Sequence, residues 1–304
     1  MNILINGISP DATIYGYALS KGHKVFHLIE KEEFEQSSKR KIRYNILDQR
    51  LKNKDSLGEY IYNCVDSIDR EYEFALVVGS EKEILESVEK IEKLSKNINY
   101  LLLGTNWSGV ENIEKIIDKN RYILGDLNSR GLFKGNLVWG NLENYISMGK
   151  TCIEQEKLLN DIEKSLRKSY ILADIKENIV HYLWIQNISK APMAMGLSKY
   201  PNMNKFIEDK DMIDICFKAM DEGYKIAEKR GVDLRKFMQV QAYTLPIDEI
   251  YPLFKENVKT NSWAKRHFLT MTTNIEELKK DFDEIYKTGK KLKIDTPNMD
   301  KLNK

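Results

Sequence analysis

The chain has 304 residues, of which 42% are hydrophobic and 31% are charged, and its 48 lysine and arginine residues nearly balance its 46 aspartate and glutamate residues. At about 150 residues per domain this length predicts two domains or one large one, and the composition excludes disordered, collagen-like and low-complexity proteins. The net charge of +2, with both signs interspersed, excludes the concentrated basic face of a nucleic-acid-binding protein.

The first half of the chain alternates short apolar runs with amphipathic stretches, which is typical of a parallel sheet with crossover helices. Strands are expected over residues 2–6, 24–29, 74–78, 100–103 and 122–124. Helices are expected over residues 10–21 and 81–96, the second with apolar residues at helical spacing.

From about Glu154 onward no strand pattern is recognised, and long helical patterns take over. Helices are expected over residues 154–168, 174–190, 211–230, 246–258 and 275–288. We therefore predict an α/β protein with a Rossmann-like dinucleotide-binding domain over residues 1–160 and an all-helical substrate or dimerisation domain over residues 161–304.

The turn between the first strand and the first helix is a candidate dinucleotide-binding loop. Placing the GxGxxG template on Gly7 puts Ser9 at the second glycine and Ala12 at the third, where alanine is permitted because that position needs only close packing of helix on strand. The same residues also describe an ordinary capped helix, with Ser9 as N-cap, Pro10 at the first helical position and Asp11 at the positive end of the helix dipole. Both interpretations stand at this point.

Glu30 follows the second strand, 23 residues after Gly7. An acidic residue at about this offset accepts the ribose hydroxyls of NAD. Glu30 thus favours NAD, whereas Lys31 beside it would suit the 2′-phosphate of NADP, and the acidic run that follows is also compatible with a solvated surface.

Five segments, taken in order, resemble the ketopantoate reductase (2-dehydropantoate 2-reductase) family. They are the opening with Leu-Ser-Lys-Gly-His-Lys-Val at residues 19–25, Asn-Trp-Ser-Gly at 106–109, Asn-Ile-Ser-Lys-Ala-Pro-Met-Ala at 187–194, the helix and Gly-Val turn at 222–234, and Glu277 placed 20 residues before Pro297. The resemblance implies a Rossmann domain followed by a helical domain like the C-terminal domain of 6-phosphogluconate dehydrogenase.

The resemblance also implies a function and a set of site residues. It implies a reductase of small 2-oxo acids with NADP or NAD as cofactor, acting in pantothenate biosynthesis in the cleft between two domains, and a homodimer is compatible with it. Asn106 would span cofactor and substrate, and Asn187 with Glu277, or the adjacent Glu276, would hold the substrate. The family's catalytic lysine, four residues before the helix asparagine, is Leu183 here.

A replacement for that general acid is sought on the same helical segment. His181 is favoured because histidine transfers protons near neutral pH; Lys190, two turns beyond Leu183, and Tyr182 are alternatives, and His181 is equally compatible with simple packing. Further along, Lys265-Arg266-His267 is either a site for an acidic substrate or a solvated helix face.

Other classes of site are not indicated. There is no nucleophile elbow, Walker loop or zinc motif, so no metal is expected. Cys64, Cys152 and Cys216 are interpreted as reduced thiols, and no signal segment or membrane span is recognised, so we expect a cytoplasmic protein without nucleic-acid or membrane partners. Two other functions stay open: a homologue without catalysis that acts as a binding or regulatory protein, and an imine or opine-type dehydrogenase.

Overall fold

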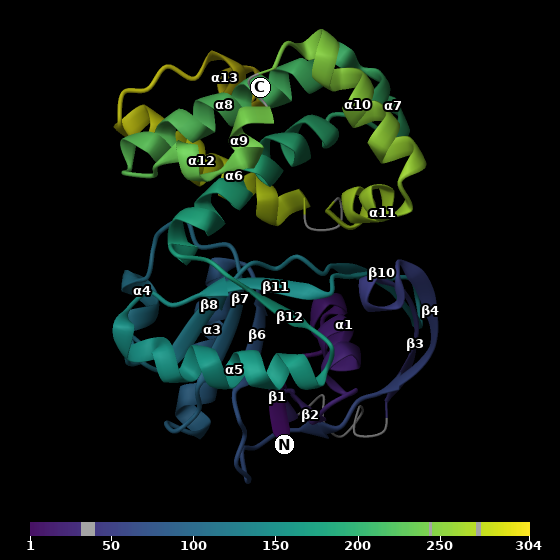
Figure 1. Cartoon of the computed structure of the whole chain (residues 1–304), viewed down its shortest axis with the longest axis vertical. Helices are drawn as coiled ribbons and strands as arrows, with labels where there is room; N and C mark the ends of the chain where they lie inside the picture. Colours follow the sequence, from purple (N-terminus) through teal and green to yellow (C-terminus); the bar gives the residue numbers. More distant parts are fainter. Residues whose placement is uncertain (32–39, 243–244, 272–274) are drawn as a thin grey trace. The chain divides into compact units, whose positions relative to one another are not determined.

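The computed structural model describes residues 1–31, 40–242, 245–271 and 275–304. The chain divides into two compact units, Met1–Val180 and His181–Lys304 (Figure 1). Each has its own buried apolar core.

The division falls 20 residues later than the predicted boundary at residue 160. The reason is that α5 (Glu156–Lys168) buries Leu159, Ile162 and Leu166 in the core of the first unit. A strand that the sequence analysis missed, β12 (Leu172–Ile175), then pairs with β11 (Tyr145–Gly149). The expectation of no strand after Glu154 is therefore wrong at β12, and the helix predicted from residue 174 begins at Ile179.

The first unit is built on an eight-stranded sheet in the order β12-β11-β8-β7-β6-β1-β2-β5. Besides β11 and β12, this sheet contains β1 (Asn2–Asn6), β2 (Lys24–Leu28), β5 (Cys64–Val65), β6 (Ala75–Gly79), β7 (Tyr100–Gly104) and β8 (Tyr122–Gly125). The six neighbouring strands β5, β2, β1, β6, β7 and β8 run parallel, whereas β11 runs antiparallel to β8. All five predicted strands are confirmed, because long apolar runs buried on both faces are a local signal.

The strand order reverses between β1 and β6, since the chain passes from β1 outward to β2 and β5 before returning to β6 on the other side of β1. In open parallel sheets, ligands bind outside the carboxyl ends of the strands at such a reversal. Helices α1 (Pro10–Leu19) and α3 (Glu81–Leu94) begin at this edge, directly after β1 and β6.

A second, four-stranded sheet was not predicted. Its order is β4-β3-β10-β9, comprising β4 (Lys54–Ile61), β3 (Lys41–Asp48), β10 (Leu137–Leu142) and β9 (Gly131–Phe133). Helix α1 packs against β9 and β10 on one side and against β1, β2 and β6 on the other (Figure 1). This explains why every residue of α1 from Asp11 to Leu19 is buried.

The described part of the second unit has only helices as regular elements, as predicted. They are α6 (Ile179–Leu197, which starts at the end of the first unit), α7 (Met203–Glu208), α8 (Lys210–Lys229), α9 (Met238–Ala242), α10 (Ile247–Thr260), α11 (Ser262–Met271), α12 (Ile275–Lys291) and α13 (Pro297–Leu302). Short 3-10 turns occur at Gln49–Leu51, Ile153–Gln155 and Leu234–Lys236, and a four-residue helix α4 at Glu111–Glu114.

Helix α8 organises the second unit. A Cβ on Gly223 would come within 2.7 Å of Ile188, so glycine permits close packing of α8 on α6. The preceding residue is Glu222, whose buried carboxylate accepts hydrogen bonds from the backbone N–H groups of Asn298 and Met299, both at 2.8 Å, and so caps the first turn of α13.

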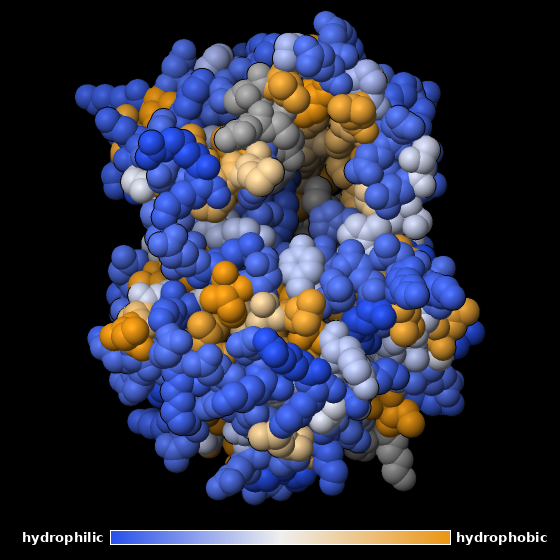
Figure 2. Space-filling model, in the orientation of Figure 1, coloured by the Kyte–Doolittle hydropathy of each residue, from blue (hydrophilic) through white to orange (hydrophobic). Residues whose placement is uncertain are grey.

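Hydrophilic residues cover most of the visible surface of each unit, and apolar residues form separate small patches (Figure 2). Among the described residues, no helix combines the length and apolar character that crossing a bilayer requires.

Candidate functional site

Gly7 forms the turn after β1. Its φ of +74° lies in the left-handed region, which favours glycine. The Gly7 N–H donates to the carbonyl of Leu28 at the end of β2 (2.8 Å), and no atom lies within 4 Å of the position that a Cβ would occupy. The backbone of Gly7 therefore faces open space, which is what close approach of a ligand requires.

The helix start after this turn is capped, as one of the two interpretations predicted. Ser9 is the N-cap, its hydroxyl oxygen accepts from the N–H of Ala12 (3.1 Å), and Pro10 is the first helical residue. Ala12 is fully buried. The Ser9 side chain is thus folded back onto the helix, where it occupies one donor that a bound anion would otherwise use.

Asp11 lies in the first turn of α1, as predicted. Its carboxylate is buried and accepts a hydrogen bond from the backbone N–H of Gly131 in β9 (2.8 Å). Burial raises the pKa of Asp11, against a lowering by the charge of Arg130 and by the hydrogen bond from Gly131. The acidic residue that would oppose a phosphate is therefore turned into the protein.

A buried polar network supports the Gly7 turn. His27 in β2 is fully buried; its Nδ1 lies 2.8 Å from the carbonyl oxygen of Gly7, and its Nε2 lies 2.8 Å from the hydroxyl of Tyr60. A carbonyl only accepts, so Nδ1 carries the proton and Nε2 accepts from Tyr60. Burial lowers the pKa of His27 to about 4, which keeps the ring neutral at physiological pH.

Glu30 and Asn106 follow β2 and β7 at the same edge of the sheet as Gly7. The exposed Glu30 carboxylate pairs with Lys90 of α3. Asn106 is 3% exposed. Ser80 forms a capping box with Glu83 at the start of α3. The parallel sheet thus brings the predicted cofactor residues to one edge.

The residues predicted on the second unit lie mainly on α6. Leu183 is 2% exposed, and Asn187 is also 2% exposed. Neither the amide nitrogen nor the amide oxygen of Asn187 has a hydrogen-bond partner among the described residues. A buried amide without partners is unfavourable by about 1–3 kcal/mol, so Asn187 is suited to hold a ligand.

His181 and Lys190, the two candidates for the proton donor, are both partly buried on α6. The His181 ring lies 5.4 Å from the ring of Trp184, centre to centre. Burial, together with the positive charges of Arg230 and Lys236, lowers the pKa of His181. Because its pKa is lowered, His181 is a weaker candidate for the proton donor than its sequence position alone indicated.

Glu277 lies in the first turn of α12, where it is partly buried. Glu276 is exposed and pairs with Lys279, so Glu277 is the better candidate of the two. The basic cluster Lys265-Arg266-His267 lies on α11, with Lys265 exposed and its two neighbours partly buried.

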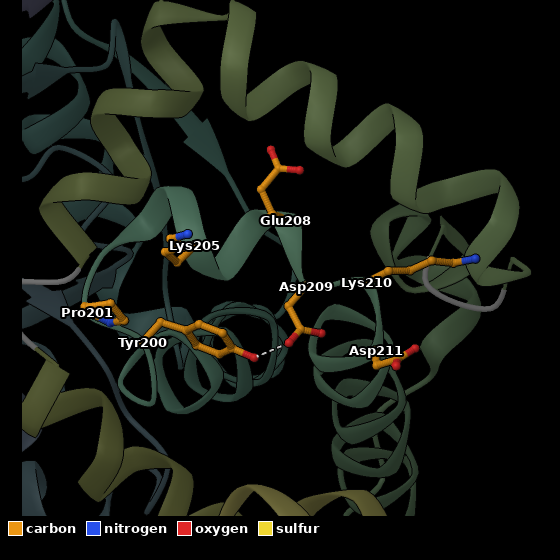
Figure 3. Close-up of a pocket in the computed structure, with 7 residues that line it drawn as sticks. All are labelled: Tyr200, Pro201, Lys205, Glu208, Asp209, Lys210 and Asp211. Carbon is orange, nitrogen blue, oxygen red and sulfur yellow. Dashed lines mark hydrogen bonds between the residues drawn. The ribbon is translucent and has the colours of Figure 1, made fainter.

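One pocket in the second unit, of about 530 Å³, contains none of the predicted residues. Figure 3 shows its lining, in which the Tyr200 hydroxyl donates to Asp209 (2.6 Å). Glu208 of this pocket pairs with Lys255 (2.5 Å) and Lys259, and Lys210 pairs with Asp248. Glu208, Asp209 and Lys210 are thus engaged with other side chains. No cluster of three potential metal ligands occurs among the described residues.

Sequence reasoning missed His27 and Arg130. A histidine between apolar strand residues is a weak signal of burial, and nothing in the sequence around Arg130 shows that it lies near the start of α1. Both acquire their places through contacts with distant strands.

No protein-family model and no curated protein matches the sequence, whereas solved structures match the fold over nearly the whole chain. Three of them are the dimeric ketopantoate reductase of Staphylococcus aureus (12% identity, TM-score 0.70, 99% of this chain and 96% of that chain), a D-mandelate dehydrogenase with NADH and anilino(oxo)acetate (16%, 0.74, 99% and 96%), and a 2-dehydropantoate 2-reductase from Geobacter metallireducens (14%, 0.72, 99% and 97%). The resemblance noted in the sequence is therefore confirmed at the level of the fold, which this chain shares with solved ketopantoate reductases at 12–14% identity.

Proposed function

We propose that this chain is an NAD(P)-dependent oxidoreductase that reduces the ketone of a small 2-oxo acid, ketopantoate or a similar compound. The observation that carries the proposal is the open Gly7 turn at the edge where the strand order reverses. The solved structures of the same fold support it, since they are named as ketopantoate reductases and as an NADH-bound dehydrogenase. A homodimer is part of the proposal, and sedimentation or light scattering tests it.

The residues at this edge fit a dinucleotide in a modified loop. Gly7 leaves room for a ligand and Asp11 is turned inward. In the proposal Gly7, Ser9 and Ala12 hold the pyrophosphate, and Glu30 accepts the ribose hydroxyls. Asn106 contacts cofactor and substrate. The bound nicotinamide supplies the hydride.

Asn187 and Glu277 hold the substrate in this proposal. The buried Asn187 amide, which has both a donor and an acceptor to offer, suits a substrate hydroxyl or ketone. A site built to hydrogen-bond such a group discriminates strongly against analogues that lack it.

The chain must also deliver a proton to the ketone oxygen as the hydride reaches the carbonyl carbon. We assign this role to Lys190 in preference to His181, because the pKa of His181 is lowered and its imidazolium form is scarce at neutral pH. Lys190 lies two turns from Leu183 on the same face of α6. An ammonium held near a developing alkoxide also stabilises its charge.

Leu183 supports a second candidate function. A buried leucine cannot donate a proton, so a homologue that binds a dinucleotide or an acid without reducing it is compatible with this position. An imine or opine-type dehydrogenase is a third candidate, because a protonated imine accepts the hydride to give an amine without a further proton from the protein.

The test is oxidation of NADH and of NADPH by the purified full chain, measured with a panel of 2-oxo acids with and without ammonia. The proposal expects reduction of at least one 2-oxo acid without ammonia, and a KM for that acid raised roughly tenfold or more in Asn187→Ala. Gln186→Ala, a neighbour on the same helix, serves as the matched control. Activity that requires ammonia would assign the imine chemistry. If none of the 2-oxo acids is reduced, with or without ammonia, the proposal is contradicted.

A further inference from the structure

Arg130 lies in the segment that follows β8. This segment, residues 126–130, is a loop that is buried throughout, and Arg130 itself is 5% exposed. Loops usually run over the surface, so a buried arginine in one of them needs a physical reason.

The Arg130 guanidinium lies close to the candidate cofactor loop. The backbone N–H of the next residue, Gly131, donates to the Asp11 carboxylate (2.8 Å), and the charge of Arg130 lowers the pKa of Asp11. Asp11 is the second residue of the helix that Ser9 caps. Arg130 therefore belongs to the same corner of the first unit as the Gly7 turn.

The guanidinium is not fully paired. Its Nη1 is buried and has no hydrogen-bond partner in the described part of the chain, and no carboxylate there is recorded within ion-pair distance of it. Other partly or fully buried arginines of this unit are paired: Arg50 with Asp48 (2.7 Å) and Arg121 with Glu92 (2.7 Å).

Asn141 adds a second unpaired group next to Arg130. Its backbone N–H donates to the carbonyl of Arg130 (3.0 Å), and its side chain is fully buried. Both atoms of its amide lack a partner among the residues that the structure describes. Burying a charge or an amide without partners is unfavourable, so this corner is built for a polar ligand.

We propose that Arg130 binds an oxyanion of the ligand at this corner, either the pyrophosphate of the dinucleotide or the carboxylate of the 2-oxo acid. The inference rests on the proposed function for the identity of these ligands. The Ser9 hydroxyl already occupies one N–H donor of the helix, so the start of α1 alone is a poor anion site. A guanidinium, which presents several N–H donors in one plane, supplies what the helix start lacks.

The test compares the full-length wild type with Arg130→Gln, and uses Arg121→Gln as the matched control because Arg121 precedes the same strand at its other end. Thermal unfolding is followed with inorganic pyrophosphate and with oxamate, an unreactive analogue of a 2-oxo acid. Dissociation constants are measured for NADH and NADPH.

We expect Arg130→Gln to weaken binding of one anion class by roughly ten- to hundredfold, as for loss of a charged hydrogen bond, and Arg121→Gln to leave it unchanged. If Arg130→Gln binds pyrophosphate and the dinucleotide more weakly than wild type, the phosphate is the ligand of Arg130. If it binds oxamate more weakly, the carboxylate is the ligand.

Equal binding of every ligand by wild type and Arg130→Gln, or no binding by wild type, overturns the inference. A wild type that binds pyrophosphate or oxamate through Arg130, but no dinucleotide, refutes the proposed function and leaves the anion site intact. If Arg130→Gln does not fold, Arg130→Lys takes its place, since it keeps the charge and loses the planar donor set; unchanged binding by that variant also overturns the inference.

Discussion

Acidification should destabilise the first unit through His27. The ring is fully buried, and burial lowers its pKa from 6.5 to about 4. An unfolded chain takes up a proton at His27 near pH 6.5, whereas the folded chain does so only near pH 4. The folded state therefore loses stability as the pH falls through this window. The two pKa values correspond to about 3 kcal/mol by pH 4, at about 1.4 kcal/mol for each pH unit.

The assay is urea unfolding of wild type and His27→Asn between about pH 7 and about pH 4. Unfolding is followed by tryptophan emission in a background in which Trp184 and Trp263 are replaced by phenylalanine. The signal then comes from Trp107 and Trp139 of the first unit. All other titrating groups are shared, so the difference between the two proteins isolates His27.

We expect wild type to lose about 3 kcal/mol more than His27→Asn across this window. Asparagine keeps a donor near the Nδ1 position for the carbonyl of Gly7 and does not titrate. Parallel stability curves for the two proteins would refute the reasoning. As a further comparison, His27→Gln keeps a polar group near Tyr60 and loses the contact to Gly7, so it should weaken dinucleotide binding more than His27→Asn does.

Three further predictions concern the second unit. Leu183→Lys should raise the rate of ketopantoate reduction if the substrate lies as in the resembling family, and it should lower stability by roughly 3 kcal/mol because an ammonium replaces a side chain that is 2% exposed; activity assays and thermal unfolding measure the two effects. Asn187→Ala should raise KM for the 2-oxo acid roughly tenfold or more, without loss of stability, because its amide lacks partners among the described residues. Glu222→Ala should destabilise the second unit by roughly 3 kcal/mol, measured by urea unfolding, because three hydrogen bonds to Asn298 and Met299 are lost.

Each of these predictions has a contradicting outcome. An unchanged rate for Leu183→Lys in a folded protein would show that the substrate pose differs. A large loss of stability in Asn187→Ala would indicate a structural role for its amide. Unfolding of Glu222→Ala at the wild-type urea concentration would show that α13 is held mainly by its apolar contacts.

The core of the parallel sheet could be predicted because its signals are local. The strands from β1 to β8 that lie near its centre are continuous apolar runs, and α3 has clear helical spacing. By contrast, β4 and β12 contribute few buried residues, so no apolar run buried on both faces marks them. Their strand conformation comes from pairing with β3 and β11.

The site was predictable where single residues fix backbone geometry, and not where tertiary contacts decide. The Gly7 turn and the Ser9 cap follow from local chemistry. The inward direction of Asp11 depends on Gly131, 120 residues away. The support from His27 depends on Tyr60, 33 residues away. The predicted boundary at residue 160 divides α5, which lies wholly in the first unit, because its amphipathic pattern does not say which core it covers.

Equilibrium binding of NADH and NADPH to the wild-type chain tests the account most directly. We predict that one dinucleotide binds with a dissociation constant in the micromolar range. Gly7→Ala should weaken that binding, because alanine is strained at a φ of +74°. If neither dinucleotide binds at millimolar concentration, the assignment of this edge of the sheet to a cofactor is contradicted.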